Sequence, residues 1–433
     1  IQFPGSVVVT STKLDIINDT ARRRKRTRGP CLLFNPEGRS GRPSTLRWNP
    51  VAGCDDPNVA IDRAGYLLAG TAGGTTGDRE FWTNNANKVL RAYLFAAARS
   101  GASLMDVKHW ANNSKDQSPL QMLIADDNAP DGWADELRQI LGAYDRYRDS
   151  VFATLAQTFD FLGTPGVREV VELGEGERSF DVRRFLTSKA TLYLIGAQRD
   201  YGSIAPLFSA LTGMIYETAK AMADESRSGR LDPPVLFALD EAPNICPVPL
   251  HRWTSEAGSR GIPIITCIQS FKQLADVWGE TRGAIIWENS TVKMFLPSGS
   301  DDETLKKVSN LCGTYEVPRV TTTKNAEGSS SSSTVMETRP VFEPHNIRMP
   351  NDFTALVIKA NKKPVTVRIE PFWERRAIRR SEARAPQRVV PAAPTPRPPT
   401  RGGTPVASPS GGGARIIPMP APTTIEAEEE QSG

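Results

Sequence analysis

The sequence predicts an α/β protein with a parallel, doubly wound sheet, an inserted all-α domain and a disordered tail. Short apolar strand patterns alternate with helical patterns along most of the chain, which is typical of a parallel sheet covered by helices on both faces. From Val59 to Leu162 the apolar residues recur at helical spacing, and no strand pattern interrupts them. From about Glu374 onward Pro, Gly, Ser and Arg dominate, a composition that cannot bury a core.

Length and composition are those of a globular protein. The 433 residues suggest two or three domains, and a hydrophobic content of 39% is enough to build cores. No stretch is apolar enough to span a bilayer, and the chain begins at Ile1 with neither a methionine nor a signal peptide, so we interpret it as a fragment. The net charge of +4 is small for this size, so any affinity for nucleic acid must come from local patches.

The cysteines show neither the spacing of a metal site nor that of a disulfide framework. They are scattered along the chain, with no CxxC motif and no paired histidines, at Cys31, Cys54, Cys246, Cys267 and Cys312. This usage fits a reducing cytosol.

The chain opens on a strand-to-helix unit. The strand is predicted from Gly5 to Thr10, and the helix starts after Ser11-Thr12 with Asp15 in its first turn. The helix ends in the basic run Arg22 to Arg28. That run is either a solvated helix end whose cations complement the macrodipole or a phosphate-binding patch.

A second strand, Cys31 to Phe34, precedes the helical insertion at Val59 to Leu162. Inside the insertion, the glycine-rich stretch Gly70 to Gly77 has the appearance of a phosphate loop. It lacks both a lysine after the glycine and a strand before it, so we predict a flexible connection between helices.

Strand patterns return at Thr191 to Ile195, followed by a predicted helix from Pro206 to Ser226. The next apolar run, Val235 to Leu239, leads directly into Asp240 and Glu241. Such a run reads as a buried parallel strand, whose carboxyl end is where α/β sheets bind ligands. This is the Walker B pattern, in which the first acid holds Mg²⁺ through water and the second polarises the attacking water. The alternative is a core strand that ends in two solvated acids.

Two more buried strands are predicted after the acid pair. A helical segment from Arg252 to Ser259 leads to the strand Ile262 to Ile268, which ends at Gln269. A glutamine there can act as a sensor of the γ-phosphate or be an ordinary surface side chain. The further strand, Thr291 to Leu296, is assigned to the same sheet.

The last ordered part of the chain is predicted to be a hairpin and a strand pair, preceded by a short helix from Lys306 to Leu311. The hairpin strands are Tyr315 to Lys324 and Thr334 to Phe342, around a mobile tip at Ser329 to Ser333. The final strands are predicted at residues 356–358 and 365–369.

Several stretches of the chain belong to a recognisable set: residues 236–244, Arg260-Gly-Ile-Pro, Gln269-Ser270 with Gln273-Leu274, Trp48-Asn-Pro50, Phe81-Trp82 and Arg339-Pro-Val. Together they resemble the type IV secretion coupling proteins, the TraG/TraD-like ATPases of conjugative DNA transfer. The resemblance implies a RecA-like motor domain at residues 1–58 and 163–373, an inserted all-α domain at 59–162 and a disordered tail at 374–433. It also implies a hexamer at the cytoplasmic face of the bacterial cell membrane that pumps single-stranded DNA or protein toward a secretion channel.

Two features of the family are missing from the sequence. There is no Gly-x-x-x-x-Gly-Lys-Ser/Thr motif and there are no N-terminal membrane helices. Both would precede Ile1 in a relative, so truncation is our interpretation, and a degenerate, catalytically inactive adaptor is the alternative. A septal-type DNA translocase is a further alternative, although those motors generally lack a helical domain inserted at this place.

The resemblance also implies roles for individual residues, with ATP and Mg²⁺ as cofactors. Asp240 would bind Mg²⁺, Glu241 would activate water, and Gln269 would contact the γ-phosphate. Arg260 would reach the nucleotide of a neighbouring subunit, or else cap carbonyl groups before Gly261. The inserted domain has two possible roles, to bind cargo (a relaxase with its DNA or an effector protein) or merely to pack. In the first case the cargo would meet polar residues exposed on the insertion, such as Lys108, Asn112, Asn113, Lys115 and Asp116.

Overall fold

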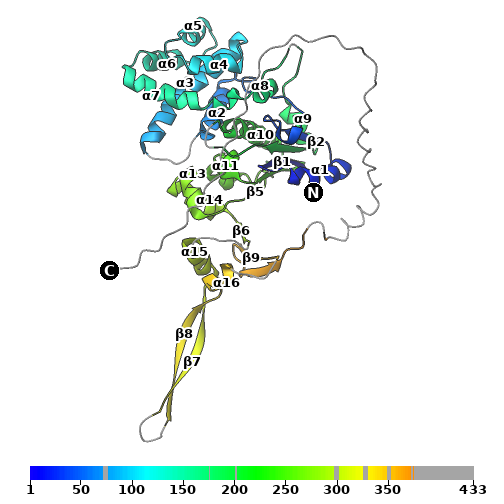
Figure 1. The fold of residues 1–433 in the computed structure, drawn as a ribbon, viewed down its shortest axis with the longest axis vertical. Coiled ribbons are helices and arrows are strands. Elements are labelled where there is room, and N and C mark those ends of the chain that lie inside the picture. The colour runs from blue at the N-terminus through cyan, green and yellow to red at the C-terminus, as the bar shows by residue number, and fades with distance from the viewer. Residues whose placement is uncertain are drawn as a thin grey trace, which may run out of the picture. The chain divides into compact units, whose positions relative to one another are not determined.

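The computed structural model describes residues 1–71, 77–174, 176–199, 202–296, 302–324, 330–348, 353–371 and 374. The predicted tail, except for Glu374, lies outside these residues, as does most of the stretch from Gly70 to Gly77. Figure 1 shows the order of the elements along the chain.

A five-stranded parallel sheet is the centre of the fold, with the strand order β2-β3-β1-β4-β5. Because every strand runs the same way, all five carboxyl ends meet at one edge of the sheet. The strands are β1 (Ser6–Ser11), β2 (Cys31–Phe34), β3 (Thr191–Ile195), β4 (Val235–Leu239) and β5 (Ile264–Thr266). The predicted strand from Ile262 to Ile268 is therefore shorter than expected, whereas the other four are confirmed.

Helices cover both faces of this sheet. On one face, alternate residues of β4, such as Phe237 and Leu239, join the large core together with helix α10 (Ala205–Glu225). On the other face, Leu236 and Ala238 pack in a smaller cluster with residues of helix α1 (Asp15–Thr27). The alternation follows from the two-residue period of a strand, and it confirms the predicted doubly wound arrangement.

Between β2 and β3 the described residues form helices and no strand. Helix α3 is central and contacts α2, α4, α5, α6 and α7, and it is buried on nearly all sides from Val89 to Ala97. No described helix has both the length and the apolar character needed to cross a membrane. These helices are α2 (Pro57–Ala69), α3 (Gly77–Ser100), α4 (Leu104–Ala111), α5 (Ser118–Ala125), α6 (Trp133–Leu141), α7 (Asp145–Gln157), α8 (Pro165–Val171) and α9 (Val182–Thr187), with 3-10 turns at Arg39–Gly41 and Asp160–Gly163.

The helical segment shares its core with the sheet. Helix α2 packs along α10, where a Cβ at Gly213 would come within 2.4 Å of the Tyr66 ring, so glycine permits this close approach. Buried residues of both regions belong to one cluster. Helices α8 and α9 lie beyond the predicted end at Leu162, and the domain boundaries stay predictions.

The predicted strand from Thr291 to Leu296 was wrongly assigned to the large sheet. It forms β6 (Val292–Phe295), which pairs antiparallel with β9 (Thr354–Lys359) in a separate three-stranded sheet of order β10-β9-β6. The outer strand β10 (Val365–Arg368) and β9 confirm the predicted strand pair. An apolar run indicates burial potential but not a pairing partner, and here Val292 and Met294 are more than half exposed.

The remaining elements follow the acid pair and fill the C-terminal part of the described chain. Strands β7 (Thr314–Lys324) and β8 (Ser330–Pro340) form an antiparallel hairpin, so Ser330 to Ser333 belong to a strand and not to the predicted tip. The other helices are α11 (Ala242–Ile245), α12 (Leu250–Glu256), α13 (Phe271–Trp278), α14 (Glu280–Asn289), α15 (Asp302–Cys312) and α16 (Pro344–Arg348).

The basic run at the end of α1 is split between solvent and core. Arg22, Lys25, Arg26 and Arg28 are exposed, whereas Arg24 is 2% exposed. The Arg24 guanidinium donates to Phe3 O (2.6 Å), Gly5 O (2.8 Å) and Thr191 Oγ1 (2.8 Å). Arg24 therefore joins the chain start to α1 and β3 and is not available to a phosphate.

Candidate functional site

The predicted acid pair lies at the carboxyl edge of the large sheet. Asp240 and Glu241 follow β4 directly, and both are half-buried. The hydroxyl of Thr10, from the neighbouring strand β1, donates a hydrogen bond to Asp240 O at 2.8 Å. This bond ties the turn after β4 to the centre of the sheet.

Glu241 has a left-handed backbone conformation, with φ 51° and ψ 37°. Its carbonyl oxygen accepts hydrogen bonds from the N–H groups of Asn244 (2.9 Å) and Ile245 (3.2 Å), so Glu241 is the N-cap residue of α11. A residue with a Cβ seldom adopts this conformation, and such strain is concentrated at functional sites. The strained turn directs the chain away from the sheet directly after Asp240.

The end of β5 lies next to the acid pair. Partial burial raises the pKa of the Cys267 thiol, and the Asp240 carboxylate raises it further by its charge and by a hydrogen bond. One residue earlier, the Thr266 hydroxyl is buried and has no hydrogen-bond partner among the described residues. The carboxyl ends of β4 and β5 therefore place Asp240, Cys267 and Gln269 in one region.

A short polar chain connects Gln269 to the segment after the acids. The backbone N–H of Gln269 donates to Gln273 Oε1 at 2.8 Å, and the side-chain Nε2 of Gln273 donates to Asn244 Oδ1 at 3.3 Å. The Ser270 hydroxyl caps helix α13 by accepting a hydrogen bond from the backbone N–H of Gln273 at 3.2 Å. The Gln269 side chain itself is exposed and has no partner among the described residues, so it is free to meet a ligand.

The acid pair has the chemistry that Mg²⁺ prefers. Neither Asp240 nor Glu241 forms an ion pair with a described basic residue, although both are half-buried. A half-buried carboxylate loses part of its hydration, and a bound cation compensates for that loss. No group of three or more acidic, cysteine or histidine side chains that could hold a metal is found in the described part of the chain. One or two carboxylates with water and phosphate oxygens fit Mg²⁺, which keeps most of its waters.

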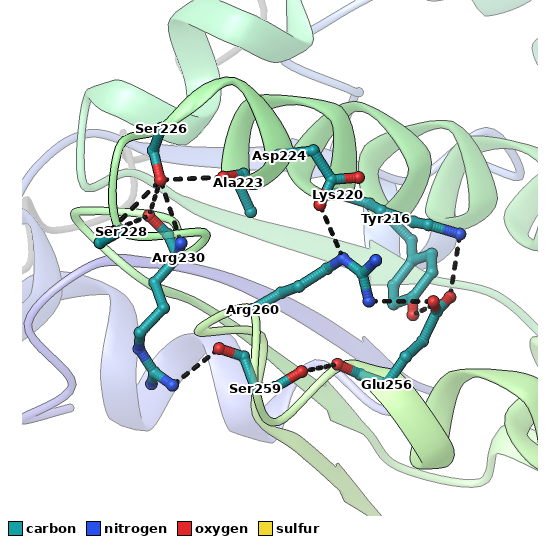
Figure 2. Close-up of polar contacts among 10 residues, drawn as sticks. All are labelled: Tyr216, Lys220, Ala223, Asp224, Ser226, Ser228, Arg230, Glu256, Ser259 and Arg260. Carbon is teal, nitrogen blue, oxygen red and sulfur yellow. Dashed lines mark hydrogen bonds and ion pairs between the residues drawn. The ribbon is translucent and has the colours of Figure 1, made fainter.

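Arg260 lies away from these residues. It precedes β5, whereas Gln269 follows it, so the two occupy opposite ends of the sheet. The Arg260 guanidinium pairs with Asp224 (3.0 Å) and Glu256 (3.0 Å), as Figure 2 shows. Carbonyl capping in this loop falls to Arg230, whose Nη1 donates to Ser259 O at 2.7 Å, and no described carbonyl accepts from the Arg260 side chain. The structure therefore does not bring Arg260 together with the acid pair of its own chain.

Of the polar residues predicted to meet cargo, Lys108 lies in α4 and the other four occupy the turn between α4 and α5. Asn112 donates to Lys108 O, Asn113 accepts from the Lys115 amide, and Asp116 accepts from the Ser118 amide. These three side chains shape the turn itself. The Lys115 side chain is exposed and Lys108 is half-buried, so two lysines stay available on this surface.

Three residues of the site were given no role from the sequence. Thr10, Asn244 and Gln273 contact the acid turn or link it to Gln269. The spacing Ser270-x-x-Gln273 is a recognisable helix-start signal that could have indicated Gln273. The contacts of Thr10 and Asn244 join residues far apart in the chain, which local patterns do not report.

Part of the chain is similar in sequence to conjugation proteins. Residues 234–351 match the family described as "TraM recognition site of TraD and TraG". A curated protein of Sinorhizobium fredii, described as a probable conjugal transfer protein TraG, is 26% identical over 144 residues. This match covers 32% of the present chain and spans only 22% of the length of that relative.

Solved structures extend the likeness to most of the chain. The unbound bacterial conjugative coupling protein TrwB has a TM-score of 0.60 at 16% identity, covering 84% of this chain and 78% of that one. TrwB with the ATP analogue ADPNP gives 0.58 at 17% identity, with coverage of 84% and 78%. TrwB with ADP and Mg²⁺ gives 0.54 at 17% identity, with coverage of 84% of each chain. The RecA-like fold and the resemblance to TraG/TraD-like coupling proteins, both predicted from the sequence, are confirmed.

Proposed function

We propose that this chain is the motor part of a conjugative coupling protein that hydrolyses ATP to drive DNA or protein cargo toward a type IV secretion channel. The observation that carries the proposal is the acid pair at the carboxyl edge of β4, with Glu241 held in a strained turn next to the end of β5. The similar protein TrwB is described in complexes with ADPNP and with ADP and Mg²⁺, which supports nucleotide as the ligand.

Each residue of the site has a defined task in this proposal. Asp240 orients the water shell of Mg²⁺, and the bound MgATP supplies the phosphoanhydride whose cleavage drives the motor. Glu241 accepts a proton from the attacking water, and Gln269 donates its side-chain amide to the terminal phosphate. Gln273 and Asn244 keep Gln269 and the acid turn in register through the hydrogen bonds described above.

The edges of β5 and β6 that are unpaired in the described part of the chain are the proposed place for a strand that carries the phosphate-binding loop. Among the described residues β5 pairs only with β4, and β6 pairs only with β9. Helices α13 and α14 connect β5 to β6, a crossover long enough to leave room for one strand between them. Ile265 and Met294, on these two strands, are 58% and 57% exposed. We propose that a strand with the missing Gly-Lys-Ser/Thr loop, supplied by polypeptide outside these 433 residues, pairs at these edges.

The remaining parts of the proposal concern assembly and partners. A homohexamer at the cytoplasmic face of the bacterial cell membrane would bring Arg260 of one copy to the nucleotide of the next. Single-stranded DNA, a relaxase or effector protein, and components of the secretion channel are the proposed partners. The family description for residues 234–351 names TraM recognition, which supports a relaxosome protein as one of them.

Substitution of Glu241 tests the proposal. In protein produced from the full reading frame that contains these residues, Glu241→Gln should still bind MgATP, because Asp240 and the phosphate-binding loop remain. Its turnover should fall by about 10²–10⁴-fold, the usual contribution of a positioned base. Binding is measured with a fluorescent ATP analogue and turnover by phosphate release. Asp276→Asn, an exposed acid on α13, is the control and should change neither quantity.

Two outcomes would contradict the proposal. Unchanged turnover in Glu241→Gln would remove this residue from the mechanism. Absence of MgATP binding by the wild-type protein would favour the alternative, a catalytically inactive adaptor that recruits secretion cargo.

A further inference from the structure

The backbone of Arg260 has one well-defined arrangement. Its carbonyl oxygen accepts a hydrogen bond from the Leu231 amide at 2.8 Å, and its own amide donates to Ala257 O at 3.2 Å. Gly261 follows with φ +78°, and a Cβ there would lie 3.0 Å from Leu231 O. Only glycine adopts this conformation readily, so the loop holds the start of the Arg260 side chain in place.

Two acids from different helices hold the guanidinium. Asp224, near the end of α10, lies 3.0 Å from Nε, and Glu256, the last residue of α12, lies 3.0 Å from Nη1. Figure 2 shows both carboxylates directed at the guanidinium. The Nη2 atom has no acceptor among the described residues, and the side chain is 24% exposed. One edge of the guanidinium is therefore free to meet an acceptor from another molecule.

Glu256 is itself held by the core. Its Oε1 accepts from Tyr216 OH at 3.2 Å and pairs with Lys220 Nζ at 3.0 Å. Tyr216 is fully buried and stacks on Trp253, with ring centroids 4.0 Å apart and planes at 6°. Burial opposes ionisation of Glu256, but Lys220, Arg260 and Tyr216 outweigh it and lower the pKa of its carboxyl group. The acid that orients Arg260 is therefore charged at neutral pH and cannot rotate freely.

Stability gives little reason for this arrangement. Ion pairs near the surface contribute little to the free energy of folding, and the chain has ordinary examples such as Arg183 with Glu225. A guanidinium that must meet charge developing in a transition state gains from being oriented in advance, because no reorganisation is then needed during the reaction.

We propose that Asp224 and Glu256 are positioning residues that hold Arg260 so that its free Nη2 edge meets the terminal phosphate of a nucleotide bound to a neighbouring copy of this chain. The inference rests on the proposed ATPase function and on the action of Arg260 between copies. It adds two residues, on α10 and α12, that no motif in the sequence indicated.

The test compares steady-state ATPase kinetics of single and double variants in protein from the full reading frame. Arg260→Ala should lower kcat by about 10³-fold or more, as expected for such an arginine. Asp224→Ala and Glu256→Gln should each lower kcat by about 10- to 100-fold, because a small misplacement of a catalytic group has an effect of this size. KM for ATP should stay unchanged, since only a transition-state contact is affected. Asp224→Glu should restore much of the activity.

Two controls separate positioning from stability. Glu225→Ala removes the neighbouring acid on α10 and an exposed ion pair with Arg183 at 2.6 Å, so it should leave kcat unchanged. Adding Asp224→Ala to Arg260→Ala should cause no further loss, because the acid acts only through the arginine. Thermal unfolding of all variants should stay close to that of the wild type.

Each result gives a decision. If Arg260→Ala lowers kcat but Asp224→Ala and Glu256→Gln leave it within about twofold, the positioning role is wrong while the proposed function stands. A rise in kcat for the acid variants would mean that they restrain Arg260, which also overturns the inference. An active enzyme that Arg260→Ala leaves unchanged would remove the role of the arginine between copies. A wild-type protein that hydrolyses no ATP would overturn the proposed function as well.

Discussion

Glu241, the proposed general base, has a backbone conformation that suits glycine better than glutamate. Its φ of 51° lies in the left-handed region, where glycine is favoured. Strain of this kind costs roughly 1–3 kcal/mol and persists only where the surrounding structure enforces it. Here the hydrogen bonds from Asn244 and Ile245 to its carbonyl oxygen enforce it. A carboxylate at a position where glycine would be more stable supports a functional reason for the acid.

Glycine and alanine at this position should therefore differ in stability. Glu241→Gly should unfold with a free energy about 1 kcal/mol higher than Glu241→Ala, because only alanine retains the left-handed strain. Urea unfolding followed by circular dichroism measures the difference. Both variants should lose ATP turnover in the full reading frame. Equal stability of the two would show that the turn carries no strain.

Helix α1 shows how one element is attached to the sheet. Its last turns are strongly basic, yet Arg24 points into the protein and donates to Gly5 O and Thr191 Oγ1, among others. Burial lowers the pKa of Arg24, which indicates a charge that is partly desolvated and compensated by hydrogen bonds. The element is thus held by a polar contact in addition to the apolar side chains of Ile16 and Ile17.

Removing this contact should destabilise the fold far more than removing an adjacent charge. Arg24→Met should lower the free energy of unfolding by about 3 kcal/mol or more, because several buried acceptors lose their donors. Arg26→Met, at an exposed position of the same helix, should change it by less than about 0.5 kcal/mol. Chemical denaturation measures both. A loss of under about 1 kcal/mol for Arg24→Met would mean that water replaces the lost donors.

At the scale of the whole molecule, Arg260 and the acid pair lie at opposite ends of parallel strands. Gly261 and Cys267 are six positions apart in the sequence, which corresponds to about 20 Å in an extended chain. One copy therefore cannot direct both groups at one nucleotide. If both serve catalysis, the active site is shared between two copies, which agrees with the proposed ring.

Mixing of inactive subunits tests this arrangement. Arg260→Ala and Glu241→Gln copies should each be nearly inactive alone, but a mixture should recover part of the ATPase activity. The reason is that some interfaces then combine an intact arginine with an intact acid pair. Activity per copy should also rise steeply with protein concentration. A constant rate in a proven monomer, or no recovery on mixing, would rule out the shared site.

The sequence by itself predicted most of the elements and the proposed chemistry of the site. Apolar runs with turn residues beside them gave β1 to β4, helical periodicity gave the segment between β2 and β3, and the acids after Leu239 indicated the Walker B turn. These signals are local, because they depend on burial and on neighbouring residues.

Only the tertiary structure decided which elements meet. Strand β6 carries the apolar pattern of a central strand but pairs with β9 in another sheet, since strand pairing depends on contacts between distant residues. Arg24 lies near the end of a helix, and Arg260 precedes a glycine. Arg24 is buried against carbonyl groups, whereas Arg260 is oriented by Asp224 and Glu256. The partner of a charged side chain comes from across the fold, so no local pattern could assign it.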